Sequence, residues 1–260
     1  MKNKFEEFVE IVQRLRKECP WDKVQTFDSI KASTIEEVYE AVESIDNKDF
    51  DELKLELGDL MLHVVLYSIM AEEEKLFNIN DVLQGGMDKL IRRHPHVFGD
   101  LELNSAEEVK TSWERLKFKE GRESVLDGVP HQMPSLQRAF RLQEKAAKVG
   151  FDWDKKEDVW KKVIEELNEL KETFEENDSG RIEDELGDFL FALVNYSRFH
   201  KINPENALRG TNEKFIRRFR YIEEKLKENN KSILNSNLEE MDFYWNEIKK
   251  AEKNSNNRLV

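Results

Sequence analysis

The sequence has very little cysteine. Cys19 is the single cysteine among 260 residues, so no disulfide can form within the chain, and a cysteine-based metal cluster is implausible. Chains without disulfides are typical of reducing compartments. We therefore expect a cytoplasmic protein.

Long apolar runs are also missing. No stretch approaches the roughly 20 apolar residues that a transmembrane helix needs. The first residues, MKNKFEEFVEIV, are acidic and amphipathic rather than basic and apolar like a secretory signal. We expect no membrane partner.

Positively charged residues are fewer than negatively charged ones. The chain has 42 Lys and Arg against 55 Asp and Glu, which gives a formal net charge of −13. A field of this sign opposes non-specific binding to nucleic-acid polymers and to anionic membrane surfaces. Any small ligand that carries phosphate must therefore be met by local cations or by a metal ion.

Glycine and proline are scarce, with ten and five residues. Four of these fifteen fall within residues 121–134, which predicts a linker there. The predicted domains are then residues 1–120 and 135–260, and the second ends in a polar tail from about Lys253.

Helical periodicity is abundant. Charged residues make up 37% of the chain and apolar residues recur at steps of three and four, a pattern typical of helices with one solvent-facing side. The pattern predicts an all-α fold. The clearest apolar stripes are Ile35, Val38, Val42 and Ile45, and Leu53, Leu57, Leu60 and Val64.

The two halves of the chain repeat one another. IEEVYE at 35–40 matches IEELNE at 164–169, an offset of 129, and LELGDLMLHVVLYS at 55–68 matches DELGDFLFALVNYS at 184–197 with the same offset. DKLIRRH and EKFIRRF follow at an offset of 125, and WERLK and WNEIK at 132. Blocks in the same order indicate duplication of one helical unit.

Carboxylates recur beside the apolar stripes. At about 100° per residue, Glu36, Glu37 and Glu40 span an arc of about 100° next to the stripe of their helix. Glu56 and Asp59 flank the stripe of the next helix in the same way. If the two helices pack antiparallel, these acids face one another. The second half repeats the arrangement with Glu166, Glu169, Glu185 and Asp188.

A divalent metal ion is the economical explanation of the repeated set. Any single glutamate here is best read as part of a solvated face, but like charges on facing helices repel unless a cation lies between them. Oxygen ligands favour Mg²⁺, with Mn²⁺ possible, over zinc. A di-iron bundle would need Glu-x-x-His, whereas the third position after Glu56 and Glu185 is Asp. We interpret His63, whose counterpart is Ala192, as a lone, partly buried histidine.

Clustered cations and two tryptophans complete the repeat. Arg and Lys at matched positions of two helices favour a clamp for phosphate. Trp113 and Trp245 favour helix packing over base stacking. The cations are Lys89, Arg92 and Arg93 in the first half and Lys214, Arg217 and Arg218 in the second.

Together these residues carry a family resemblance. E-E-x-x-E, a spacer and E-x-x-D occur twice, with CPWDKVQT, RRHPHVFGD and NEKFIRRF around them. Over residues 5–250 the sequence resembles the two-domain MazG nucleoside triphosphate pyrophosphohydrolases. The resemblance implies two tandem helical domains, each completed to a four-helix bundle by homodimerisation. It also implies Mg²⁺-dependent cleavage of nucleoside triphosphates to the monophosphate and pyrophosphate.

The resemblance also implies roles for residues of the second half. Water would attack the α-phosphorus, with Glu165 orienting or deprotonating it, and no covalent nucleophile is needed. Arg181 aligns with a family residue, commonly lysine, that contacts the nucleotide, and Trp245 would lie beside the base or sugar. The implied metal ligands are Glu166, Glu169, Glu185 and Asp188, and the implied phosphate contacts are Lys214 and Arg218, with Arg217 beside them.

The two halves differ in the charged residues and the helices that could bind phosphate. Arg181 aligns with Glu52, which puts a repelling charge where the second half has an attracting one. Pro95 should end or kink the first-half helix that carries the cations, whereas its second-half counterpart can continue past Phe219. We expect the main site in the second half. The first half keeps Glu37, Glu40, Glu56 and Asp59 and could hold metal in a weaker or regulatory role.

Two alternatives stay open at the level of sequence. One is a non-enzymatic helical dimer whose acidic clusters bind metal for structure or docking. The other is a pyrophosphohydrolase narrowed to a deoxynucleotide, a damaged nucleotide or an alarmone.

Overall fold

The computed structural model describes residues 3–105, 108–109, 112–113, 116, 123–174 and 178–256. Across these ranges every regular element is a helix, which confirms the predicted all-α class. The chain divides into two compact units, Met1–Leu116 and Lys117–Val260. The predicted limits of the linker stay a prediction, and its first two residues lie outside the described part.

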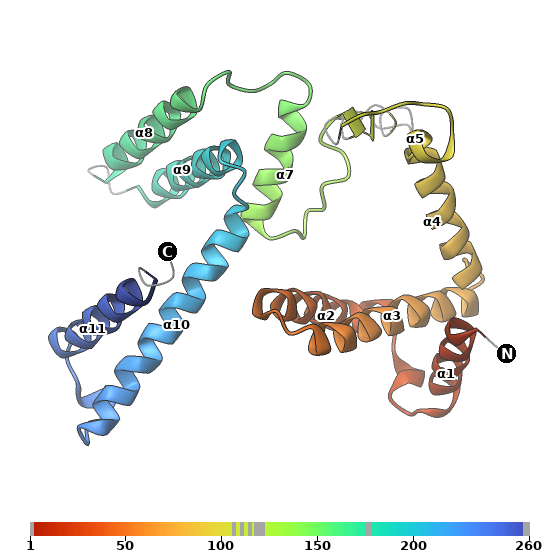
Figure 1. Cartoon of the computed structure of the whole chain (residues 1–260), viewed down its shortest axis with the longest axis horizontal. Helices are drawn as coiled ribbons and strands as arrows, with labels where there is room; N and C mark the ends of the chain where they lie inside the picture. Colours follow the sequence, from red (N-terminus) through yellow and green to blue (C-terminus); the bar gives the residue numbers. More distant parts are fainter. Residues whose placement is uncertain are drawn as a thin grey trace. The chain divides into compact units, whose positions relative to one another are not determined.

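The N-terminal unit is built around one helical hairpin. α2 and α3 pack along each other, and α1 and α4 contact α3 (Figure 1). The elements are α1 (Lys4–Glu18), η1 (Asp22–Val24), α2 (Phe27–Asn47), α3 (Phe50–Glu73), α4 (Ile79–Arg93) and α5 (Pro95–Phe98).

Local sequence signals set the limits of this hairpin. Thr26 and Ser29 form a capping box at the start of α2, and Asp49 caps α3 by accepting a hydrogen bond from the Glu52 backbone N–H at 3.1 Å. Lys48 ends α2 in the left-handed conformation, with φ of 56°. Since only Lys48 and Asp49 connect the helices, α3 must run back along α2. The acidic faces of the two helices are thereby brought together.

The core of the N-terminal unit lies where α1 crosses this hairpin. Val12 of α1, Ile30 of α2 and Val65 of α3 are each no more than 1% exposed, and Leu66 and Met70 extend the cluster. Burial of such side chains contributes about 1.5 to 3 kcal/mol each. The core lies toward one end of the hairpin, and the carboxylates lie toward the other.

The C-terminal unit repeats the hairpin. α8 packs along α9, α7 crosses α9, and α11 lies along α10. Val159, Val163 and Val194 are its most buried aliphatic side chains on the hairpin. The elements are α7 (Ser135–Ala147), α8 (Lys156–Thr173), α9 (Ser179–Phe199), α10 (Pro204–Glu228), η2 (Ile233–Asn235) and α11 (Leu238–Asn256).

The two cation-bearing helices differ in length as the sequence predicts. α4 ends at Arg93, and Pro95 begins the separate turn α5. α10 continues for 25 residues to Glu228. None of the described helices combines the length and the apolar character that crossing a bilayer requires.

The left-handed Lys48 gives a test of the hairpin connection. A side chain in this conformation costs about 1 to 2 kcal/mol, which glycine avoids. We expect Lys48→Gly to raise the free energy of unfolding of the N-terminal unit by about 1 kcal/mol, as measured by urea titration of the full chain.

Lys54→Gly is the matched control, because Lys54 is an exposed residue inside α3. Glycine there should lower the free energy of unfolding by about 1 kcal/mol. Equal losses from both substitutions would contradict a strained connection at Lys48.

Candidate functional site

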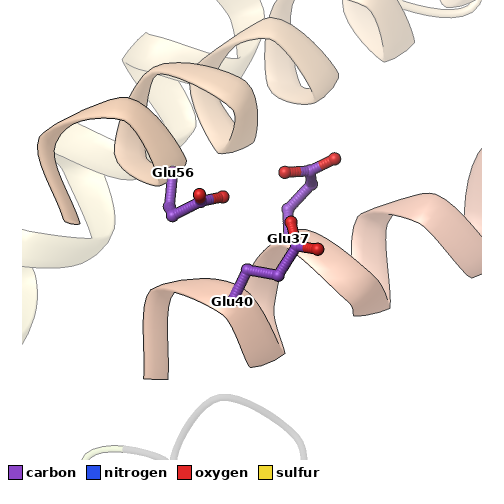
Figure 2. Close-up of side chains that lie close together, drawn as sticks. All are labelled: Glu37, Glu40 and Glu56. Atoms are coloured by element: carbon purple, nitrogen blue, oxygen red, sulfur yellow. The ribbon is translucent and has the colours of Figure 1, made fainter. Parts of the chain in front are cut away.

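An acidic cluster lies between α2 and α3. Carboxylate oxygens of Glu37, Glu40 and Glu56 all lie within 4.8 Å of one another. Figure 2 shows Glu56 extending from α3 toward the two glutamates of α2. Glu56 is buried, whereas Asp59 is exposed and outside this group, as is Glu36. Three of the four predicted N-terminal ligands are therefore brought together.

The proton affinity of Glu56 reflects its crowded position. Burial, followed by the charges of Glu40, Glu37 and Glu52, raises the pKa of Glu56 to about 7. Glu52 stands where the second half has Arg181. The repelling charge inferred from the sequence thus acts directly on the cluster.

A second acidic cluster lies between α8 and α9. Glu166 is 6% exposed and belongs to two overlapping groups, each with oxygens within 4.8 Å. Glu165 and Glu169 join it from α8, and Glu185 and Asp188 join it from α9. The structure therefore brings together every acid predicted for the C-terminal site.

The presence of Lys162 distinguishes the second acidic cluster from the first. Its Nζ lies 2.6 Å from Glu166 Oε1 and 2.7 Å from Glu165 Oε1, and these two hydrogen bonds raise the pKa of Lys162. The residue at the same place in the first repeat is Ser33. Sequence reasoning missed Lys162, although its spacing of three and four residues from the two glutamates is the signal that predicts such pairs.

Glu169 has a raised pKa within the second cluster. Its pKa is raised chiefly by the hydrogen bond it shares with Glu166, and further by burial and by the charges of Glu166 and Glu185. Lys162 acts in the opposite direction. A divalent cation among these oxygens would offset the part of this increase that comes from the charges of Glu166 and Glu185.

An apolar cavity of about 470 Å³ adjoins the second cluster. Glu166 and Asp188 form part of its wall, and most of the rest is aliphatic or aromatic. In the first repeat the place of Asn195, which lines the cavity, is taken by Leu66, a residue of the buried core. The two acidic clusters therefore have different surroundings.

Two of the three cations predicted to clamp phosphate are paired within the C-terminal unit. Arg217 donates to Glu252 Oε1 at 2.7 and 2.9 Å, and Arg218 Nε donates to Glu252 Oε2 at 2.9 Å. Burial of Glu252 acts to raise its pKa, but the two arginines outweigh it and lower the value. Arg218 also lies over the Trp245 ring, 5.3 Å from the centroid.

The other predicted substrate contacts also lie on helix surfaces. Lys214 is exposed on α10 and Arg181 is exposed in the first turn of α9. Trp245 packs against Phe215, with ring centroids 5.5 Å apart, as helix packing predicts. The cavity wall contains none of the α10 and α11 residues predicted to bind substrate.

The first-half counterparts form a separate arrangement. Trp113 packs edge-on against His94, with centroids 5.2 Å apart. Lys89 and Arg92 are exposed on α4. His63 is 8% exposed and its Nδ1 has no partner among the described residues, so it is buried more deeply than the sequence suggested.

Comparison with known proteins identifies the repeated unit. A family model described as the MazG nucleotide pyrophosphohydrolase domain matches residues 25–98 and again residues 155–222. Each match contains one of the two acidic hairpins. The chain belongs to the MazG family. The prediction of two tandem MazG domains is thereby confirmed.

Two relatives align with this chain over almost their whole length. The nucleoside triphosphate pyrophosphohydrolase of Escherichia coli (strain K12) is 41% identical over 259 residues, covering 96% of this chain and 98% of that protein. The nucleoside triphosphate pyrophosphohydrolase/pyrophosphatase MazG of Thermotoga maritima is 42% identical over 250 residues, covering 94% and 95%. The uncharacterized protein YabN of Bacillus subtilis is 46% identical over 97% of this chain and 53% of its own length.

The pKa of Glu56 predicts a pH-dependent stability of the N-terminal MazG domain. Because the folded pKa is raised from 4.5 to about 7, the folded state loses stability as pH rises through this interval, and the penalty is complete above pH 7. In chelator-treated protein, Glu56→Gln should raise the melting temperature at pH 8 and change it little at pH 5.

Glu36→Gln serves as the control, because Glu36 lies on the same hairpin but outside the cluster. Its melting temperature should follow the wild type at both pH values. An increase for Glu56→Gln of the same size at pH 5 and pH 8 would contradict the assigned cause.

Proposed function

We propose that this chain hydrolyses nucleoside triphosphates to the nucleoside monophosphate and pyrophosphate, chiefly at the C-terminal cluster. The supporting observation is that the buried Glu166 and its neighbour Asp188 border an apolar cavity of about 470 Å³. Such a place offers acidic oxygens for a cation and an enclosed space for a base. The names of the two full-length relatives agree with this activity.

The donor set of the C-terminal cluster fits Mg²⁺. Glu166, Glu169, Glu185 and Asp188 supply only carboxylate oxygens, and Mg²⁺ is usually held by a few carboxylates together with phosphate oxygens. When bound, the ion would supply neutralisation of phosphate charge and activation of water. In the absence of metal, Lys162 neutralises part of the negative charge of the cluster, so cation binding should weaken its bonds to the glutamates.

The chain's own residues then orient the reactants. Glu165 lies at the exposed side of the cluster, where it can orient the attacking water and accept its proton. Attack at the α-phosphorus leaves pyrophosphate as the departing group. The phosphates would be bound by Arg181, Lys214 and Arg218. To bind phosphate, Arg218 must share or give up its hydrogen bond to Glu252.

The same proposal gives the N-terminal cluster a lesser role. Glu37, Glu40 and Glu56, with Asp59 nearby in sequence, would bind a divalent cation weakly or for regulation. Glu52 adds repulsion there, and the position of Lys162 is held by Ser33. The N-terminal repeat thus retains acids but lacks the second repeat's supporting groups.

Homodimerisation belongs to this proposal. Each domain presents a two-helix hairpin whose apolar residues remain partly uncovered, including Val38 and Leu57 in the first and Ile164 and Leu190 in the second. A second copy would cover these side chains and complete a four-helix bundle. Association could also bring cations of α10 from a partner toward the acidic cluster.

The nucleotide substrate and the unpaired Cys19 suit a reducing cytoplasm.

Pyrophosphate release tests the proposed activity and its location. We expect wild-type protein with Mg²⁺ to release pyrophosphate from canonical and deoxynucleoside triphosphates, and Glu169→Ala to lose at least about 100-fold in kcat, since it removes a metal ligand. Glu40→Ala is the matched substitution in the other domain and should retain near wild-type turnover.

Loss of pyrophosphate release in Glu40→Ala but not in Glu169→Ala would assign the reaction to the N-terminal domain. Absence of pyrophosphate from every triphosphate would contradict the enzymatic proposal and favour a metal-binding interaction protein. Colorimetric detection of pyrophosphate, combined with chromatography of the nucleotide products, distinguishes these results.

Dimerisation is tested by charging the uncovered face. Leu190→Asp should shift the sedimentation coefficient from dimer to monomer, because a charge in a buried interface lacks compensation. Leu234→Asp is the control, since Leu234 is 90% exposed in η2, away from the hairpin stripe. A monomeric wild type, or identical behaviour of both variants, would contradict the predicted bundle.

A further inference from the structure

One carboxylate of α11 binds two neighbouring arginines of α10, the helix that α11 lies along (Figure 1). Nε and Nη2 of Arg217 lie 2.9 and 2.7 Å from Glu252 Oε1, and Nε and Nη2 of Arg218 lie 2.9 and 2.8 Å from Glu252 Oε2. Each carboxylate oxygen therefore binds one guanidinium group. Adjacent side chains of a helix point about 100° apart, so the shared carboxylate brings the two cationic groups to one place.

Arg218 is held on two sides. Its side chain is 19% exposed and that of Glu252 is 21% exposed, so the ion pair is partly removed from water. The Trp245 ring lies 5.3 Å from the guanidinium carbon of Arg218, and Phe215 packs against the same ring. Exposed ion pairs contribute little to stability, but a partly buried arginine with a carboxylate at one edge and an aromatic ring at one face has a fixed orientation.

The contacts with Glu252 leave one amino group of each arginine over. They use Nε and Nη2, and a guanidinium also carries donors on Nη1. Among the residues that the structure describes, neither Arg217 Nη1 nor Arg218 Nη1 has a hydrogen-bond partner. Two guanidinium groups around one carboxylate keep a net positive charge. A phosphate chain suits such a place, because its oxygens can accept from both Nη1 groups.

The same residue types recur in the first half of the sequence. The offset of 125 matches the two arginines with Arg92 and Arg93, and the offset of 132 that aligns the tryptophan motifs matches Glu252 with Glu120. Glu120 lies outside the described residues. Two arginines and a glutamate at matched places of both repeats indicate that the combination belongs to the helical unit and is not an accidental surface pair.

We propose that Glu252 is a positioning residue, which aligns Arg217 and Arg218 so that their Nη1 groups bind the phosphate chain of the substrate. This inference rests on the proposed function and adds a residue that does not itself touch the nucleotide. Arg218 keeps its bond to Glu252 and shares its guanidinium between carboxylate and phosphate. Alignment before binding reduces the side-chain entropy that the arginines lose when phosphate binds. Neutralising Glu252 should therefore weaken phosphate binding, although it removes a negative charge.

Binding of inorganic tripolyphosphate in the presence of Mg²⁺, measured by calorimetry, tests this role without turnover. We expect Glu252→Gln to weaken the affinity about 10-fold, the factor typical of one lost charge-assisted hydrogen bond. In ATP hydrolysis this variant should raise KM about 10-fold and keep kcat within about 2-fold, since the arginines bind phosphate equally before and during the reaction. Glu252→Asp keeps the charge on a shorter side chain and should lie between Glu252→Gln and the wild type.

Glu240→Gln is the matched control on the same helix. Glu240 Oε2 accepts a hydrogen bond from Lys231 at 2.7 Å, and its side chain is 25% exposed, but Lys231 is not among the cations predicted to bind phosphate. This variant should keep the wild-type affinity and KM. Circular dichroism melting shows whether each variant is folded. If Glu252→Gln is not, Glu252→Asp decides, and wild-type affinity in that variant would overturn the inference.

The inference and the proposed function fail differently. Equal or tighter binding of tripolyphosphate by folded Glu252→Gln would overturn the positioning role, because a carboxylate that only competes with phosphate would release the arginines once neutralised. An equal loss of affinity in Glu240→Gln would also overturn it. Absence of pyrophosphate release from ATP would overturn the proposed function, and the tripolyphosphate affinities would still decide the inference.

Discussion

Repulsion between carboxylates on facing helices is the constraint around which both domains are organised. In each domain a hairpin brings at least three acidic oxygens within 4.8 Å. The N-terminal domain relieves this charge below about pH 7 by binding a proton, since the pKa of Glu56 is raised to about 7. The C-terminal domain relieves it with a cation of its own, Lys162, which bonds Glu165 and Glu166. Both solutions keep the carboxylates close together.

The duplicated hairpin has been adapted differently in the two copies. Side chains that pack into a closed core in the first, such as Leu66, correspond to side chains that line a cavity in the second, such as Asn195. A cavity beside an acidic cluster can enclose a base while its phosphates lie next to the cluster. The cluster of the first copy borders instead a pocket of about 310 Å³ whose wall is polar and acidic and includes Glu40, Glu52 and Glu56. The proposed division of labour between the domains therefore follows from a few substitutions in the α2–α3 and α8–α9 hairpins, within a common fold.

Sequence periodicity and offset predicted the all-α class, the repeat and the meeting of acids on paired helices. These features depend on local spacing, which the sequence displays directly. Contacts between distant segments were not predictable in this way. Glu252, on the last helix, pairs with Arg217 and Arg218 more than 30 residues earlier, and nothing in the spacing indicates it. The bond from Gln143 to Phe191 likewise depends on how α7 crosses α9, which tertiary packing decides.

We propose that water attacks the α-phosphorus at the C-terminal cluster. This attack is tested by hydrolysis of ATP in ¹⁸O-water by the Glu40→Ala chain, in which the N-terminal cluster has lost a carboxylate, followed by mass spectrometry of both products. We expect one ¹⁸O atom in the nucleoside monophosphate and none in pyrophosphate, formed at the wild-type rate. Label in pyrophosphate, or loss of the reaction in this variant, would contradict it.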